Sequence, residues 1–251
     1  MKLDWDYSEL AESYHSRAPY CPIFITDAIK ISELKAHAAV CDVGAGTGFL
    51  AREFAAKNMM VHAIEPNSEM QKHGKKSCVE WPAINWLKAH AEQIPLTDGS
   101  VDMVSFGSSF NVVNKHQALK ESARVCKKNG WFLIVWNHRD IATGLQHQIE
   151  SYIKRKIPAF DYGSRRDDQM SYLQSTGLFS EIHSLESHFM HEQRKDEVVT
   201  AWHSHATLKR QAGKNHQMML EEISAMINEQ AGPMIKTHFV TKGWLAKFAV
   251  F

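Results

Sequence analysis

The chain has 251 residues, of which 44% are hydrophobic and 23% charged, as expected for one large soluble domain rather than a pair. Its 29 lysines and arginines nearly balance its 28 aspartates and glutamates, which leaves a formal charge of +1. This balance argues against a protein that mainly binds nucleic acid, because neutralising phosphates requires a basic face. The longest strongly apolar run, at 131–136, is far shorter than the roughly 20 residues of a membrane span.

The amino terminus and the cysteines indicate the compartment. The first ten residues carry three acidic groups and no apolar stretch, so we expect no signal peptide. The four cysteines lie far apart and form no C-x-x-C pair. We therefore expect a reduced, cytoplasmic protein without a membrane or nucleic-acid partner.

The amino-terminal residues 1–34 predict two helices, at 8–17 and 23–34, separated by Pro19 and Pro22. From residue 35 to 137, short apolar runs alternate with amphipathic stretches. They predict strands at 38–43, 60–64, 84–89, 101–106 and 131–136, and helices at 49–57, 68–77 and 115–128, the last stopped by Asn129 and Gly130. This alternation is typical of a parallel sheet with helices on both faces.

After residue 137 the chain becomes rich in His, Met and Gln. Its pattern predicts helices at 144–156, 167–175, 195–207 and 216–231, and strands at 182–190, 235–241 and 244–251. We expect one domain over 1–251. Its parts are lid helices in 1–34, a ligand-binding core in 35–137, and pocket additions with the final strands in 138–251.

Glycines directly follow the first predicted strand, in the run Asp42-Val43-Gly44-Ala45-Gly46-Thr47-Gly48. They let the backbone turn tightly and approach a ligand without a Cβ, while the next helix offers free N–H groups to an anion. The dinucleotide pattern G-x-G-x-x-G is not met, because Phe49 takes its last position. An ordinary tight turn is the alternative.

A carboxylate ends the next predicted strand. Glu65 follows Gly44 by 21 residues, the span of one helix and one strand, so it is expected beside the glycine loop. There it can accept hydrogen bonds from both ribose hydroxyls of an adenosine. Pro66 then ends the strand, and Ser68 can cap the helix that follows.

These motifs resemble the class I S-adenosylmethionine-dependent methyltransferases, as does the run AEQIPLTDGSVD at 91–102. The resemblance implies an α/β fold, with a doubly wound, mostly parallel, Rossmann-like sheet of seven strands and helical additions. It implies S-adenosylmethionine as cofactor and S-adenosylhomocysteine as product. We expect cofactor contacts from Tyr14, Arg17, Asp42, Gly44, Ala45, Gly46, Thr47, Gly48, Glu65, Pro66, Met70, Ala91, Glu92 and Ser108.

Two further stretches resemble small-molecule enzymes similar to trans-aconitate methyltransferase. One is Tyr14-x-x-Arg17-x-x-Tyr20-x-Pro22, and the other combines 124–130 with 136–140. Such relatives often carry a His-Trp pair where this chain has Asn111-Val112, so the resemblance does not supply a base there. We expect substrate contacts from Tyr20, Phe110, Asn111, Trp136, Arg139, Arg165 and Trp202.

Methyl transfer from a sulfonium is an in-line displacement, which depends on alignment and water exclusion. A carboxylate acceptor needs no base, whereas a phenol or ammonium does. The candidate bases, which the sequence does not rank, are His138, Tyr162, His203 and His205. His188 and His191 look like a metal pair, but residues three apart on a strand point to opposite faces, so no metal is expected.

We therefore expect an enzyme of class EC 2.1.1 that methylates an oxygen or nitrogen of a small molecule, as a monomer or homodimer. The seven prolines include no Pro-Pro pair, so the clamp of nucleobase amino-methyltransferases is missing. Two alternatives stay open. One is a regulatory module that binds the cofactor without turnover, and the other is transfer of a different group from a cofactor derivative.

Overall fold

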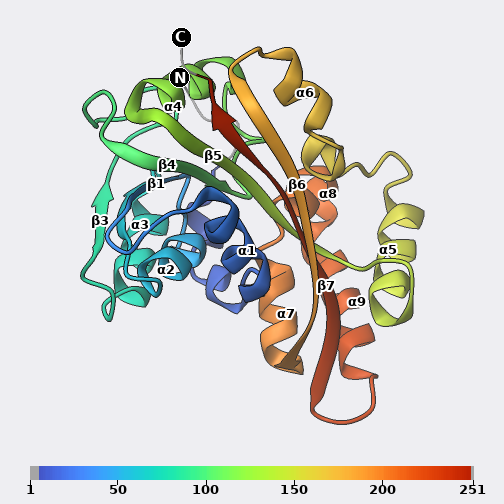
Figure 1. The fold of residues 1–251 in the computed structure, drawn as a ribbon. Coiled ribbons are helices and arrows are strands. Elements are labelled where there is room, and N and C mark those ends of the chain that lie inside the picture. The colour runs from blue at the N-terminus through green and yellow to red at the C-terminus, as the bar shows by residue number, and fades with distance from the viewer. Residues whose placement is uncertain (1–5, 250–251) are drawn as a thin grey trace.

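The computed structural model describes residues 6–249, and its centre is one sheet in the order β3-β2-β1-β4-β5-β7-β6 (Figure 1). Its strands are β1 (Ala39–Val43), β2 (Met60–Ile64), β3 (Ile84–Leu87), β4 (Val101–Gly107), β5 (Cys126–Arg139), β6 (Phe179–Arg194) and β7 (Met234–Phe248). The first five are parallel, and β7 runs antiparallel between β5 and β6. The predicted doubly wound, mostly parallel sheet of seven strands is confirmed.

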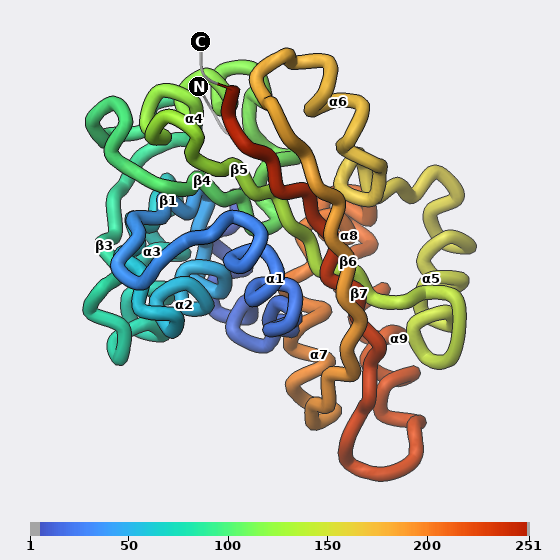
Figure 2. The backbone as a smooth tube through the Cα atoms, in the orientation of Figure 1, coloured from blue at the N-terminus to red at the C-terminus, as the bar shows by residue number. Residues whose placement is uncertain are grey.

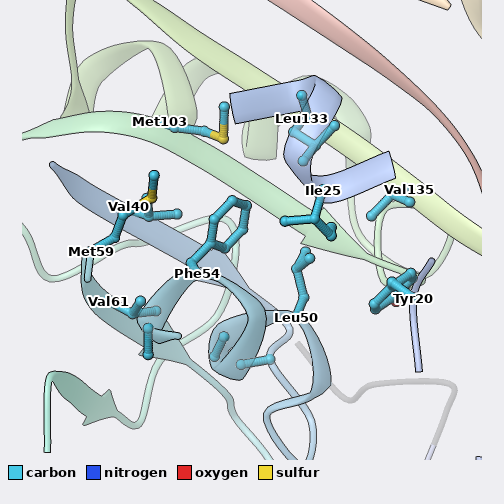
Figure 3. Packing of buried hydrophobic residues seen from close by; sticks show 14 of the residues in the cluster. Tyr20, Ile25, Val40, Leu50, Phe54, Met59, Val61, Met103, Leu133 and Val135 are labelled. Carbon is cyan, nitrogen blue, oxygen red and sulfur yellow. The ribbon is translucent and has the colours of Figure 1, made fainter. Parts of the chain in front are cut away.

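Helices cover both faces of the sheet. The helices of this part are α1 (Pro22–Ser32), α2 (Phe49–Ala55), α3 (Ser68–Ser77) and α4 (Lys115–Val125). Successive residues of a strand point to opposite faces, so Val40 packs with α1 and α2, whereas Cys41 and Val43 pack with α4. Figure 3 shows the first of these cores, with Phe54 beside Val40.

The carboxyl-terminal half adds a helical cap with a core of its own. The cap consists of α5 (Gly144–Lys156), α7 (Lys195–His203), α8 (Ala206–Ala212) and α9 (His216–Asn228). These helices gather around the long strands β6 and β7, away from α2 and α3 (Figure 2). The remaining short elements are η1 (Ser8–Leu10), η2 (Ser13–Ser16), η3 (Gly163–Arg166), α6 (Met170–Ser175) and η4 (Gly213–Asn215).

Several predicted boundaries were wrong. The helix expected at 8–17 is two 3₁₀ turns, η1 and η2. The helix expected to reach residue 128 ends at Val125, because Cys126 is already extended and pairs with Val101 of β4. Asn129 and Gly130 therefore lie within β5 and do not stop a helix.

Two predictions in the carboxyl-terminal half also need correction. The helix expected at 195–207 is divided at Ser204, because the His205 side chain caps α8. The strands expected at 235–241 and 244–251 are one strand, β7, whose ladder with β5 continues through Lys242 and Gly243. The parts of these predictions at 1–5 and 250–251 lie outside the described residues.

Candidate active site

The glycine loop lies at the carboxyl end of β1, where the chain order of the sheet reverses between β1 and β4. The Gly44 N–H donates to the Ile64 carbonyl (2.8 Å), which joins the loop to β2. Gly44 and Gly46 both have positive φ, at 68° and 58°. A Cβ on Gly44 would lie 2.5 Å from the Ser109 Cβ, whereas a Cβ on Gly46 would meet no heavy atom of the described residues within 4 Å. Gly44 is thus required by packing, and Gly46 keeps space open above the loop.

Two buried carboxylates accompany the loop. Glu65 accepts hydrogen bonds from the backbone N–H groups of Gly46 and Asn67, both at 2.8 Å. Burial raises the pKa of Glu65, and these two bonds oppose the shift. Asp42 accepts from the Ser105 hydroxyl with one oxygen (3.0 Å), and its other oxygen has no partner in the described residues. Burial raises the pKa of Asp42 to about 7, with a further contribution from Glu65.

A cavity runs from the glycine loop to the helical cap. Of the residues expected to contact the cofactor, those that line it are Tyr14, Arg17, Asp42, Gly44, Ala45, Gly46, Thr47, Glu65, Pro66, Met70, Ala91, Glu92 and Ser108. Gly48 is placed elsewhere, because it caps α2 and a Cβ on it would meet Cys78 and Trp86. The structure thus brings together residues from the amino-terminal segment, β1, β2 and the loops after β3 and β4.

The amino-terminal segment closes one side of the cavity. The Arg17 guanidinium lies 3.9 Å from the centre of the Tyr14 ring and donates to the hydroxyl and the carbonyl of Ser204 (2.8 and 2.7 Å). The Tyr20 hydroxyl lies 3.1 Å from that of Ser108, at the end of β4. The segment is therefore attached to both the cap and the sheet.

The cap side of the cavity carries a concentration of positive charge. Arg139, at the end of β5, lies 4.4 Å from the centre of the Trp202 ring, while Arg165 and Arg166 lie 4.7 and 4.4 Å from the centre of the Tyr162 ring. Within residues 6–249, no carboxylate pairs with any of these three arginines or with Arg17. We call these four residues, Arg17, Arg139, Arg165 and Arg166, the arginine cluster.

Electrostatics within the arginine cluster are repulsive. The pKa values of Arg139 and Arg165 fall to about 10, first because of burial and then because of the neighbouring Arg17. Burial and mutual repulsion of these charges therefore destabilise the unliganded fold. An anion that binds in the cavity would reduce the repulsion.

The arginine cluster also lowers the pKa values of two of the predicted bases, His138 and His205. Burial, then Arg166 and Arg165, lower the pKa of His138 to about 3, and burial followed by Arg165 and Arg139 lowers that of His205 well below its usual range. Both rings are thus neutral at pH 7. His205 Nδ1 accepts the Leu208 N–H (3.1 Å), so its proton sits on Nε2. His205 therefore presents a donor to the cavity, not a proton acceptor.

The other two candidate bases differ in position. Tyr162 lines the cavity, but its hydroxyl donates to Glu150 (2.5 Å), and burial together with that carboxylate raises its pKa to about 12. His203 is exposed and lies in a separate hollow with His15 and Lys209. His138 lines the cavity as a neutral ring, but a pKa of about 3 makes it a weak proton acceptor.

Of the expected substrate residues, Tyr20, Arg139, Arg165 and Trp202 line the cavity, whereas Phe110, Asn111 and Trp136 do not. Phe110 is buried against Phe106 and Phe132. The Trp136 indole donates to Asn111 (3.0 Å) and packs on Trp244. Side chains alternate along β5, so Asn137 faces the cavity and its neighbour Trp136 faces the core.

Sequence reasoning missed several residues that line the cavity, among them Tyr7, Asn67, Gln146, Glu150 and Phe239. Gln146 and Glu150 lie one turn apart on α5 and are 6% and 5% exposed. Two polar residues on the buried stripe of an amphipathic helix are the signal that could have revealed them.

The depressed pKa of His138 predicts a specific pH dependence of stability. In the unfolded chain His138 has a pKa of about 6.5, so it binds a proton below that pH. In the folded protein it stays unprotonated until the pH falls to about 3. Stability should therefore fall as the pH falls from 7 to 5, by about 2 kcal/mol from this residue. Asparagine at position 138 should reduce this loss in thermal melts, and asparagine at the exposed His116 should not. If the melting temperatures of all three proteins fell equally between pH 7 and pH 5, His138 would not be the cause of the loss of stability.

No metal site or membrane span emerges from the described part of the chain. Residues 6–249 contain no group of three or more His, Cys, Asp or Glu side chains placed to hold a metal ion. His188 Nδ1 lies 3.2 Å from His238 Nε2, while His191 packs on Phe239. No helix in this range is long and apolar enough to cross a bilayer.

Comparisons with known proteins agree with this geometry. Residues 41–134 match a family model described as a methyltransferase domain. An uncharacterized methyltransferase of Mycobacterium tuberculosis is 34% identical over 116 residues, which are 46% of each chain. A ubiquinone/menaquinone biosynthesis C-methyltransferase of Caulobacter vibrioides is 30% identical over 148 residues, 53% of this chain and 58% of the relative. The chain spans about half the length of the curated relatives it matches.

Solved structures extend the likeness over the whole fold. A candidate type II methyltransferase from Anaeromyxobacter dehalogenans superposes with a TM-score of 0.68 at 15% identity, over 94% of this chain and 99% of that one. A candidate methyltransferase of antibiotic biosynthesis from Anabaena variabilis gives 0.61 at 19% identity, over 90% and 98%. At such identities the likeness concerns the fold. Residues 41–134 therefore resemble a methyltransferase domain, in a chain whose seven-stranded sheet has the Rossmann-like fold of these solved structures.

Proposed function

We propose that the protein is a cytoplasmic S-adenosylmethionine-dependent methyltransferase whose acceptor is a small molecule with an anionic oxygen. The observation that carries the proposal is the single cavity, which joins the glycine loop and Glu65 at one end to the arginine cluster at the other. A nucleoside cofactor and an anionic acceptor would thus meet within one continuous cavity.

The cofactor end fits S-adenosylmethionine. The open space above Gly46 admits a ligand close to the backbone, and Glu65 lies where ribose hydroxyls can donate to it. The unpartnered oxygen of Asp42 is an acceptor for a further donor of the cofactor, and Ala91 with Glu92 borders the same cavity. When bound, this cofactor supplies a methyl group on a positively charged sulfur, already activated for attack in line.

The acceptor end fits an ionised group. Arg139, Arg165 and Arg166 approach the cavity from two segments without carboxylate partners among the described residues. Guanidinium groups bind carboxylates through paired hydrogen bonds, which orient the acceptor as well as hold it. Arg17 and the tyrosines of the amino-terminal segment line the same cavity and would help to shield a bound cofactor and acceptor from water.

The state of the histidines supports an acceptor that needs no base. His205 presents a donor, and the pKa of His138 is about 3, so neither is suited to remove a proton from a neutral hydroxyl or ammonium. A carboxylate arrives already deprotonated. We therefore favour methylation of a carboxylate oxygen, with the chain supplying alignment.

Glutamine in place of Glu65 tests the cofactor assignment. The change keeps the volume but removes the charge that ribose hydroxyls would meet, and it sets an amide NH2, which cannot accept, against the Gly46 or the Asn67 N–H. The dissociation constant of S-adenosylhomocysteine should therefore rise roughly ten- to a hundredfold. Titration calorimetry measures it, and glutamine at Glu69, an exposed carboxylate on α3, is the matched control.

Two outcomes would redirect the proposal. If NADH raised the melting temperature of the wild type and S-adenosylmethionine did not, the protein would be a dinucleotide-binding enzyme instead. Tight cofactor binding without S-adenosylhomocysteine production from any small carboxylate would favour a regulatory module. Mass spectrometry of a ligand retained through purification would reveal a cofactor derivative that donates another group.

A further inference from the structure

The side chain of Gln146 is buried without a partner in the acceptor half of the cavity. It lies in the first turn of α5, lines the cavity and is 6% exposed. Neither the nitrogen nor the oxygen of its amide has a hydrogen-bond partner in the part of the chain that the structure describes. Burying an amide in this state is unfavourable, so a neutral polar residue here indicates a ligand group that satisfies it.

Several hydrogen-bond donors line the same cavity as Gln146. The Arg165 Nε and the Trp202 Nε1 are also buried without partners in the described residues, and His205 carries its proton on Nε2. One turn after Gln146, Glu150 accepts from the Tyr162 hydroxyl with Oε2, while its Oε1 lies 3.3 Å from the Lys154 amine without a hydrogen-bond partner in the described residues. Among the described residues, the Gln146 carbonyl is thus an acceptor without a partner, in a cavity that these donors also line.

We propose that Gln146 is a specificity-determining residue that binds a hydroxyl group of the acceptor, next to the anionic group held by the arginine cluster. The acceptor is accordingly a small hydroxycarboxylate. This inference rests on the proposed function and narrows the substrate class of the same site.

The chemistry of the amide selects a hydroxyl over a second carboxylate. A hydroxyl both donates and accepts, so it can satisfy the oxygen and the nitrogen of one amide, whereas an arginine offers donors only. A carboxylate at this point would face the Gln146 carbonyl and lie near the buried carboxylate of Glu150, and both are unfavourable neighbours for an anion. A hydroxyl carries no charge and avoids this repulsion.

Paired probes that differ by one hydroxyl test the proposal. The pairs are DL-malate with succinate and citrate with tricarballylate, titrated by calorimetry into the protein saturated with S-adenosylhomocysteine. The wild type should bind the hydroxylated member of at least one pair about three- to tenfold more tightly, the range of one neutral hydrogen bond. Methionine at position 146 keeps the length of the side chain without hydrogen-bonding groups, and should abolish the preference.

Methionine at Gln71, on α3, is the matched control. The amide nitrogen of Gln71 is also buried without a partner in the described structure, but Gln71 does not line the cavity. The Gln71 variant should keep the wild-type preference. Equal binding within both pairs by the wild type, or a preference that survives in Q146M, would overturn the role of Gln146. Failure of all four probes to bind while S-adenosylhomocysteine binds would overturn the acceptor class, and failure of S-adenosylhomocysteine itself would overturn the proposed function.

Discussion

Valine at Gly46 should raise the dissociation constant of S-adenosylhomocysteine at least about a hundredfold. A Cβ at this position would meet no heavy atom of residues 6–249 within 4 Å, because the space belongs to the cavity. An isopropyl group would fill the space that the cofactor needs. Its backbone, at φ 58°, is also unfavourable for a β-branched residue, and a shift there would weaken the 2.8 Å bond from the Gly46 N–H to Glu65.

The control for this experiment must carry the same backbone strain without the steric block. Gly99, in the turn before β4, has φ 61° and likewise no heavy atom within 4 Å of an added Cβ, but it does not line the cavity. Valine there should lower the melting temperature by a similar amount and leave cofactor binding unchanged. An unchanged dissociation constant in the Gly46 variant, measured by calorimetry, would mean that the loop does not contact the cofactor.

The end of the cavity at the glycine loop could be predicted because its signals are local in the sequence. Gly44, Gly46 and Glu65 follow two successive strands of a parallel sheet, and the carboxyl ends of such strands meet at one edge. Strand periodicity and glycine spacing therefore place these residues together without knowledge of the rest of the fold. The same reasoning predicted β2 and α3 at their observed bounds.

The end of the cavity at the arginine cluster could be predicted only in part, because its residues converge from distant segments. Arg17 reaches Ser204 across 187 positions of the chain, a contact that no local pattern encodes. Trp136 and Asn137 are neighbours in sequence, but their side chains lie on opposite faces of the sheet. Which of the two faces the cavity depends on the register of the strand. The His205 cap was hidden inside a continuous helical pattern, so the donor role of this ring required the observed break at Ser204.

Replacing both Arg139 and Arg165 by methionine should lower kcat/KM for a carboxylate acceptor at least about a hundredfold, while the dissociation constant of S-adenosylhomocysteine stays within about twofold. Each arginine can offer charged hydrogen bonds worth about 1.5–3 kcal/mol, and their joint loss leaves the acceptor anion without its main partners. Methionine preserves much of the packing against Trp202 and Tyr162. Methionine at Arg155, which lies against Tyr152 on α5, is the control.

The same double variant should melt at a higher temperature than the wild type when no acceptor is present. The pKa values of Arg139 and Arg165 lie near 10, below their ordinary value, so at pH 7 the folded protein holds both charges less favourably than the unfolded chain does. Removing them relieves that repulsion, as expected where function is kept at the expense of stability. A variant that melts lower and still turns over carboxylates at the wild-type rate would show that the arginines serve the fold and that the acceptor binds elsewhere. Higher stability together with lost turnover would identify the arginine cluster as the acceptor site.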